Sequence, residues 1–305
     1  MDAKAVEASS AQSQIVTLRS GRRLGVVTYG DPKGQPVLAL HGAPASRLMF
    51  DVADRPARER GVRLIAFDRP GYGLSPLDYG ASLRSRTEVF AELPDALGLD
   101  RFSLLGISGG GPYAAAMAAR LGSRVTGLAL VSPLGPVVEL ASRSAANPVS
   151  LSMAQRMLFL DLPGHPWVLR ANGEIMVRSF RVAPRLFASA FVHLLPDVDR
   201  VILSRDDVSK SMIAMTLEAT CHGILGGIAD LEIYGEPWNV DLSGATAPSV
   251  LWQGTADTIV PPQVALRLGE MIPRCTVHRL KGAGHFWIYD AIPEVLEAVA
   301  AFGEA

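Results

Sequence analysis

The residues with the clearest chemical potential form the pentapeptide Gly106-Ile107-Ser108-Gly109-Gly110. It stands between an apolar run, residues 102–107, that predicts a strand and an alanine-rich segment, residues 112–121, that predicts a helix. A sharp strand-to-helix turn strains the serine backbone and exposes its hydroxyl, and flanking glycines let neighbouring segments approach. A helix-capping serine is the alternative interpretation. The position between strand and helix makes Ser108 the candidate nucleophile.

A serine hydroxyl needs a base to take its proton and an acid to orient that base. Asp257 follows a predicted strand at residues 249–253, and His285 follows another at residues 276–280. Open α/β sheets build their sites at the carboxyl ends of such strands, and the chain order Ser, Asp, His occurs in them. We predict His285 as the base and Asp257 as the acid. Glu139 is the alternative acid, and a capping role for Asp257 stays open.

Attack on a carbonyl also needs backbone amides that stabilise the developing oxyanion. Gly109 supplies one such amide after the serine, and the loop His41-Gly42-Ala43-Pro44 follows a predicted strand at residues 36–41. Pro44 has no N–H, so Ala43 is the second candidate donor, with Gly42 allowing the turn that aims it. His41 is expected to tie this loop down by hydrogen bonds, and we also consider it for substrate contact.

Short apolar runs alternate with helical patterns along most of the chain, which predicts an α/β fold. The expected fold is a mainly parallel, eight-stranded sheet with helices on both faces. Residues 14–18 and 24–29 read as an antiparallel hairpin leading into it. Further strands are expected at residues 62–68, 102–107 and 126–132, and helices at residues 45–60, 83–98, 112–121, 262–271 and 292–302.

From residue 135 to residue 236 the alternation stops and the sequence becomes helical, with apolar clusters and several prolines. We interpret this stretch as an inserted helical cap, and residues 1–134 with 237–305 as the core domain. Met157 in the cap and Phe286 beside His285 are candidate substrate contacts. His165, His193 and His222 in the cap and His278 in a strand are expected to be packed or surface residues.

The composition argues for a small-molecule substrate. The 305 residues carry a net charge of -1 with no Lys/Arg run, which gives no electrostatic footprint for nucleic acid or a membrane. Although 49% of residues are hydrophobic, no stretch predicts a spanning helix, and residues 1–14 lack a secretory pattern. We therefore expect a cytoplasmic protein, monomer or homodimer. Cys221 and Cys275 offer no metal-ligand spacing and are expected to be small buried residues.

These motifs together resemble those of the α/β-hydrolase superfamily, in its order. They are the loop 41–44, the segment Asp68-Arg69-Pro70-Gly71-Tyr72-Gly73-Leu74-Ser75, the pentapeptide 106–110, Gly-x-x-Asp at 254–257 and Gly-x-Gly-His at 282–285. The resemblance covers the chain apart from the cap, and it implies that residues 68–75 form a structural turn. Serine rather than aspartate at position 108 argues against a haloalkane dehalogenase or epoxide hydrolase. The missing Gly-Gly-Gly loop makes the chain less similar to hormone-sensitive-lipase esterases.

The expected activity is hydrolysis of a carboxylic ester or lactone with an apolar acyl part, through an acyl-enzyme and without metal or organic cofactor. Two other hydrolases remain open: one that cleaves a carbon–carbon bond in a diketone, and an aminopeptidase acting on N-terminal proline. The aminopeptidase needs cap acids for the substrate amine, for which Asp161, Glu174, Asp197 and Asp199 are available. A non-catalytic ligand receptor is the remaining alternative, although it has no need of a base and its acid.

Overall fold

The computed structural model describes residues 12–142 and 148–303, so most of the amino-terminal segment without a secretory pattern lies outside the described residues. Eight strands of the described chain form one sheet in the order β1-β2-β4-β3-β5-β6-β7-β8. Their bounds are β1 (Gln14–Thr17), β2 (Arg23–Gly30), β3 (Gln35–Leu40), β4 (Val62–Phe67), β5 (Phe102–Ile107), β6 (Val125–Val131), β7 (Ser249–Gly254) and β8 (Cys275–Leu280). Only the pairs β1–β2 and β2–β4 are antiparallel. The expected fold class and hairpin are confirmed.

The helices of the core follow the strands largely as predicted. They are η1 (Arg47–Ala53), α1 (Asp54–Glu59), α2 (Leu83–Phe90), α3 (Leu93–Ala96), η2 (Ser108–Gly110), α4 (Gly111–Leu121), η3 (Gly122–Arg124), α12 (Pro262–Met271), η7 (Trp287–Asp290) and α13 (Ile292–Ala301). The single helix expected over 83–98 is wrong, because α2 ends before α3 begins. Pro94 lies in the first turn of α3, where its missing N–H breaks no helical hydrogen bond.

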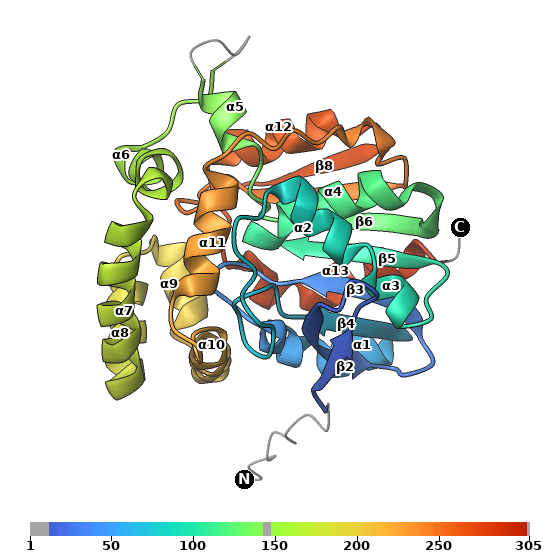
Figure 1. The fold of residues 1–305 in the computed structure, drawn as a ribbon, viewed down its shortest axis with the longest axis horizontal. Coiled ribbons are helices and arrows are strands. Elements are labelled where there is room, and N and C mark those ends of the chain that lie inside the picture. The colour runs from blue at the N-terminus through green and yellow to red at the C-terminus, as the bar shows by residue number, and fades with distance from the viewer. Residues whose placement is uncertain (1–11, 143–147, 304–305) are drawn as a thin grey trace.

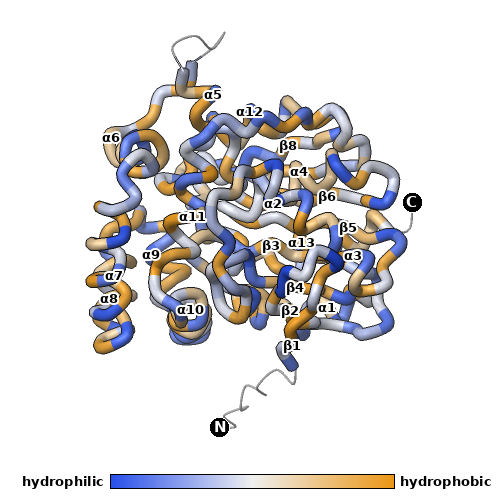
Figure 2. Tube along the Cα trace, viewed as in Figure 1, coloured by the Kyte–Doolittle hydropathy of each residue, from blue (hydrophilic) through white to orange (hydrophobic). Residues whose placement is uncertain are grey.

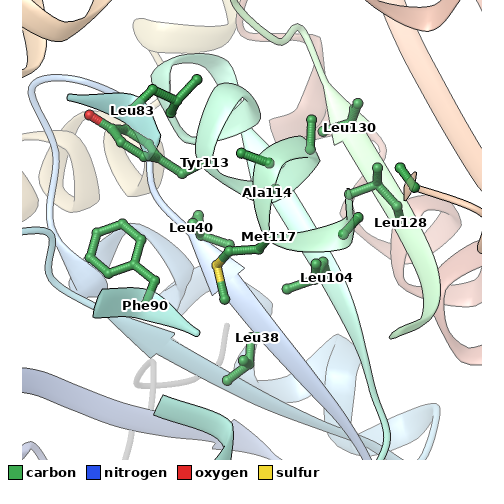
Figure 3. Packing of buried hydrophobic residues seen from close by; sticks show 14 of the residues in the cluster. Leu38, Leu40, Leu83, Phe90, Leu104, Tyr113, Ala114, Met117, Leu128 and Leu130 are labelled. Atoms are coloured by element: carbon green, nitrogen blue, oxygen red, sulfur yellow. The ribbon is translucent and has the colours of Figure 1, made fainter. Parts of the chain in front are cut away.

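Apolar side chains cover both faces of the sheet. Helices α2, α4 and α12 pack on one face, and α1 and α13 pack on the other. Because the inner strands are buried on both sides, they read as continuous apolar runs. Figure 3 shows side chains of α4 lying over β3, β5 and β6: Tyr113, Ala114 and Met117 against Leu38, Leu40, Leu104, Leu128 and Leu130. This packing fixes the position of α4 on the sheet, and with it the position of the turn between β5 and α4.

The described residues between β6 and β7 contain helices and no strand. They are α5 (Val137–Ala141), α6 (Met153–Arg156), η4 (Met157–Asp161), η5 (Leu162–Gly164), α7 (Pro166–Val182), α8 (Pro184–His193), α9 (Asp197–Leu203), α10 (Asp206–Ala219), α11 (Leu225–Tyr234) and η6 (Leu242–Gly244). Figure 1 shows α7 and α8 at the edge of the molecule and α11 between them and the sheet. The limits 135 and 236 for a separate cap stay a prediction.

The helices of this insertion differ in how deeply they are buried. Helix α11 buries five residues, including Asp230 and Tyr234, whereas α7 buries only Gly173 and Val177 and α8 buries none. Large apolar side chains are exposed on α7 and α8, among them Trp167, Ile175, Val182, Leu186 and Phe191. The tube in Figure 2 shows hydrophobic residues along both helices. The inner helix thus belongs to the packed interior, while the outer pair has few buried contacts.

The two cysteines are not buried as expected. Cys221 lies in the turn after α10 and is exposed, and Cys275 begins the edge strand β8 and is partly buried. One side of an edge strand is open to solvent, which explains the exposure at Cys275. Burial still raises the pKa of the Cys275 thiol to about 11. Across residues 12–142 and 148–303, no helix is both long enough and apolar enough to traverse a bilayer.

Candidate active site

Ser108 lies at the turn between β5 and α4, as the pentapeptide predicts. Its φ of +51° falls in the left-handed region, which costs a non-glycine residue about 1–3 kcal/mol. The neighbouring glycines are required for space: a Cβ at Gly106 would lie 2.6 Å from the Cβ of Ala114, and one at Gly110 would overlap the carbonyl oxygen of Leu40. Close packing of α4 and β3 therefore holds the serine in its strained conformation.

Three side chains that follow β5, β7 and β8 meet at this edge of the sheet. His285 Nδ1 lies 2.7 Å from Asp257 Oδ2, and His285 Nε2 lies 3.1 Å from Ser108 Oγ. An ionised carboxylate only accepts, so it keeps the proton on Nδ1 and leaves Nε2 free to take the serine proton. The side chain of Asp257 is fully buried and that of His285 is 8% exposed. The structure thus brings the three predicted residues together in the order that proton transfer needs.

Asp257 is held by groups that the sequence did not single out. Its Oδ1 accepts the backbone N–H groups of Ile259 and Val260, each at 2.9 Å. Its Oδ2 accepts Nε2–H of Gln253 at 3.0 Å besides the imidazole N–H. Gln253 is the penultimate residue of β7, just before the turn to Asp257, so only its place in the chain could have drawn attention to it. Four donors fix the carboxylate that orients His285.

The loop 41–44 lies directly against the nucleophile turn. A Cβ at Gly42 would lie 3.4 Å from the Cβ of Ser108, and one at Gly109 would lie 3.0 Å from the Cβ of Ala43. The two predicted amide donors, Ala43 and Gly109, therefore belong to adjoining segments beside the serine. An oxyanion hole is built from two such segments.

Comparison with known proteins agrees with this architecture. The model of the alpha/beta hydrolase fold family matches residues 35–291, most of the chain. The chain belongs to this family. The uncharacterized hydrolase YcgS of Bacillus subtilis is 32% identical over 274 residues, covering 90% of this chain and 93% of that protein. Haloalkane dehalogenase 2 of Mycobacterium tuberculosis is 26% identical over 90% of both chains. An esterase of Exiguobacterium antarcticum shares the fold, with a TM-score of 0.71 at 20% identity, covering 96% of this chain and 100% of that one.

In this alpha/beta hydrolase, His41 is fully buried, so it exposes no surface for the substrate contact that we also considered, and the loop-holding role that we expected remains. Its Nδ1 lies 2.7 Å from the carbonyl of Gly42, and its Nε2 accepts the backbone N–H of Arg69 at 3.1 Å. Burial, with Arg69 nearby, holds the pKa of His41 well below its usual value, so the ring is neutral. Both ring nitrogens are bonded to the protein, and the residue ties the loop down.

Arg69 is a second buried residue that holds the loop, and the sequence indicated only a structural turn there. Its guanidinium donates to the carbonyl of Gly42 at 2.9 Å and also to the carbonyl of His41. The same group makes a 2.6 Å ion pair with Asp230 of α11. The carbonyl of Gly42 and the N–H of Ala43 belong to the same peptide group. Helix α11 of the insertion therefore helps to orient the Ala43 N–H, through Asp230 and Arg69.

Asp230 also accepts hydrogen bonds from two buried tyrosine hydroxyl groups. Tyr72 donates to it at 2.8 Å and Tyr113 donates at 2.7 Å. Burial, and then the charge of Asp230, raises the pKa of both tyrosines well above the usual value, so both remain donors at neutral pH. The carboxylate thus accepts from Arg69 and two tyrosines in a buried network, with its side chain 6% exposed.

Tyr234, one turn further along α11, contacts the nucleophile turn itself. Its hydroxyl donates to the carbonyl of Gly109 at 2.7 Å. Just before the insertion, the N–H of Leu134 donates to the carbonyl of Ser108 at 3.0 Å. The residue that leads into the insertion and the last residue of its helix α11 therefore contact consecutive residues of the turn.

Of the four cap acids considered for binding a substrate amine, Asp199 and Glu174 bond the main chain, and Asp197 and Asp161 face solvent. Asp199 is buried and accepts the backbone N–H groups of His285 and Phe286 at 3.0 and 2.8 Å. The side chain of Asp197 is 87% exposed and that of Asp161 is 56% exposed. Glu174 Oε1 lies 3.4 Å from the backbone nitrogen of Ile224.

The remaining predicted residues are placed as follows. Phe286 packs edge-on against the ring of His285, with centroids 5.1 Å apart, whereas Met157 begins η4 and is 52% exposed. Their contact with a substrate stays a prediction. Glu139, the alternative acid, accepts the backbone N–H of Trp238 at 2.6 Å instead of contacting the imidazole. Of the other histidines, His165, His193 and His222 are exposed, and His278 stacks on Trp252 at 5.9 Å.

Proposed function

We propose that the protein is a serine hydrolase that cleaves a carboxylic ester or lactone with an apolar acyl part through an acyl-enzyme. The observation that carries this proposal is the chain of contacts from Asp257 through His285 to the strained Ser108. Such an arrangement raises the nucleophilicity of a hydroxyl, which a ligand-binding receptor would not need.

Each step of the proposed reaction falls to a named group. Ser108 Oγ attacks the carbonyl carbon while its proton passes to His285 Nε2, and the amides of Ala43 and Gly109 stabilise the oxyanion. The imidazolium then protonates the leaving oxygen, and the acyl group stays on Ser108. Water, deprotonated by the same nitrogen, hydrolyses this ester, while Asp257 stabilises the imidazolium in both halves.

The side chains next to His285 support an apolar acyl part. Phe286 contacts the imidazole, and Phe191 of α8 packs edge-on against Phe286 with centroids 6.4 Å apart. Apolar walls with few polar groups are typical of sites for small apolar ligands. This pair puts aromatic surface against the imidazole ring, which favours an apolar acyl part.

Carbon–carbon bond cleavage is the second candidate, because 2-hydroxymuconate semialdehyde hydrolase of Pseudomonas putida is 26% identical over 276 residues.

Dehalogenation is disfavoured by chemistry despite the similarity to a dehalogenase. Displacement of halide by Ser108 would leave an ether, which the hydrolytic half-reaction cannot open. The aminopeptidase gains no support, since Asp199 already bonds the main chain and Asp197 faces solvent.

The test is hydrolysis of p-nitrophenyl esters of increasing acyl length, beside a lactone and diketone panel. Ser108→Ala should reduce kcat by about 10⁶-fold and abolish labelling by a fluorophosphonate, because the attacking oxygen is gone. Asp257→Asn should reduce kcat by about 10⁴-fold, because the wrong imidazole tautomer is favoured.

Glu139→Gln is the matched control for Asp257→Asn, since its carbonyl can still accept the N–H of Trp238. It should retain wild-type activity. Undiminished hydrolysis by the Ser108→Ala variant would refute the assignment of Ser108 as the nucleophile. Binding of panel compounds without turnover or labelling in the wild type would favour the receptor.

A further inference from the structure

We propose that Asp199, which lies on cap helix α9, is a positioning residue for the base His285; this inference rests on the proposed function. Asp199 Oδ2 accepts the backbone N–H of His285 at 3.0 Å, and Oδ1 accepts that of Phe286 at 2.8 Å. Two oxygens on two consecutive amides fix the orientation of the peptide that joins these residues. The carboxylate never contacts the imidazole ring and acts only through the backbone.

The histidine loop is shaped to receive this carboxylate. Asp199 is fully buried, and a Cβ at Gly284 would overlap its carboxyl group. Position 284 therefore has to be glycine for Asp199 to reach the two amides that follow. The carboxylate needs the space that glycine leaves at position 284. In turn, the N–H groups of His285 and Phe286 need a buried acceptor, which the carboxylate supplies.

The other anchors of the loop leave the amide of His285 to Asp199. Ahead of the histidine, the carbonyl of Ala283 accepts the N–H of Ala256 at 2.9 Å, and the N–H of Gly282 donates to Thr255 Oγ1 at 2.9 Å. Both of these contacts come from the loop that bears Asp257. They set the approach of the chain. From the core, Ser132 Oγ donates to the carbonyl of His285 at 3.4 Å, whereas the N–H groups of His285 and Phe286 are both held by Asp199 from the cap.

Helix α9 is itself fastened to the segment that follows the histidine. Arg205, just beyond α9, forms an ion pair with Asp290 and donates to the carbonyl of Tyr289 at 3.3 Å. Leu195 and Leu203 on either side of Asp199 belong to an apolar cluster that includes Phe286 and Tyr289. Cap and histidine loop thus form one packed unit around the carboxylate.

The decisive variant is Asp199→Asn, assayed with the ester that the wild type hydrolyses best. The amide nitrogen of Asn cannot accept, so one backbone N–H loses its partner and the loop shifts. Displacements of about 1 Å in a catalytic group lower rates by about 10²-fold. We expect kcat and the rate of fluorophosphonate labelling to fall together by about this factor, with KM changed less than about twofold.

Asp197→Asn is the matched control, because Asp197 is on the same helix with its side chain in solvent. It should match the wild type in kcat, KM and labelling. Gly284→Ala breaks the same contact from the core side and leaves α9 intact, so it serves if Asp199→Asn folds poorly. We expect a similar fall in kcat and labelling for Gly284→Ala.

The double variant distinguishes positioning from general damage. If both substitutions break one contact, the double variant should be no slower than the slower single variant. The inference would be overturned if the fold-losses in kcat of the two single variants multiplied in the double variant. It would also be overturned if Asp199→Asn kept wild-type kcat and labelling and only its Tm fell. A wild type that neither labels nor hydrolyses esters would instead overturn the proposed function on which it rests.

Discussion

Two histidines within reach of the nucleophile turn show how contacts decide the role of a side chain. His285 uses one ring nitrogen for Asp257 and the other for Ser108, so it can move a proton. His41 uses both nitrogens on the backbone of its own loop and of Arg69, so it can only hold structure. Both histidines stand in loops that follow a strand, so the sequence pattern is similar for the two. Only their hydrogen-bond partners distinguish the role of one from that of the other.

The buried His41 predicts a pH effect on stability. Burial beside Arg69 holds its folded-state pKa well below the unfolded value of 6.5. Below pH 6.5 the unfolded chain therefore binds one proton more than the native protein, and stability falls as pH falls. The limiting slope is about 1.4 kcal/mol per pH unit. Above pH 6.5 this residue contributes no pH dependence.

Urea unfolding at pH 7.5, 6.5 and 5.5 measures this slope. His41→Gln removes the titrating group while keeping a donor and an acceptor, so its stability should decline less steeply between pH 6.5 and 5.5. Parallel pH profiles for variant and wild type would contradict the assignment.

At the scale of elements, helix α11 connects the insertion to the loops around Ser108. Asp230 acts through Arg69 on the carbonyl of Gly42, and Tyr234 acts on the carbonyl of Gly109. Helix α11 therefore holds the peptide that bears the N–H of Ala43, and it holds the carbonyl of Gly109, the residue that carries the other candidate donor. A helix that the sequence predicts as part of the inserted cap thus also holds the loops on either side of Ser108.

Asp230→Asn should be strongly destabilising. The substitution leaves the buried guanidinium of Arg69 without its counter-charge, and breaking such a pair costs about 3–5 kcal/mol. The free energy of unfolding in urea measures the loss. Glu232→Gln, on the same helix but outside the network, should stay within about 0.5 kcal/mol of the wild type. Equal stability of the two variants would show that Arg69 finds another partner.

The sequence was sufficient where local pattern determines structure. Apolar runs located the strands, and the glycine-flanked turns located Ser108, Asp257 and His285 at the strand ends. It was insufficient for contacts between distant positions: Asp230 and Arg69 are 161 residues apart, and Asp199 and His285 are 86 apart. A buried acid has no periodicity that reveals its partner. Pro94 did carry a local signal, and it marked the break between α2 and α3.

At the scale of the whole molecule, burial is uneven across the insertion. The outer helices α7 and α8 bury two residues between them, whereas α11 is packed and hydrogen-bonded to the core. Segments with few buried contacts open locally at low free energy, without global unfolding. Figure 2 shows that apolar residues nevertheless lie along the outer pair.

Hydrogen–deuterium exchange read by mass spectrometry should rank the helices accordingly. Among the helices, peptides from α8 and α7 should exchange fastest, and peptides from α11 should exchange as slowly as those from α4 in the core. The strands β5 and β6 are the internal reference for full protection. Slow exchange in α8 would mean that its exposed apolar side chains are covered in solution.

The residue just before the insertion and the last residue of its helix α11 contact adjacent residues of one turn, Leu134 on Ser108 and Tyr234 on Gly109. A segment whose ends are neighbours can be exchanged for another without stretching the rest of the chain. For protein engineering, residues 135–233 are thus a natural unit to transplant between relatives. A transplanted segment would keep the catalytic geometry only if it also brought counterparts of Asp199 and Asp230. Selecting donor caps by those two acids, rather than by length, is the practical rule.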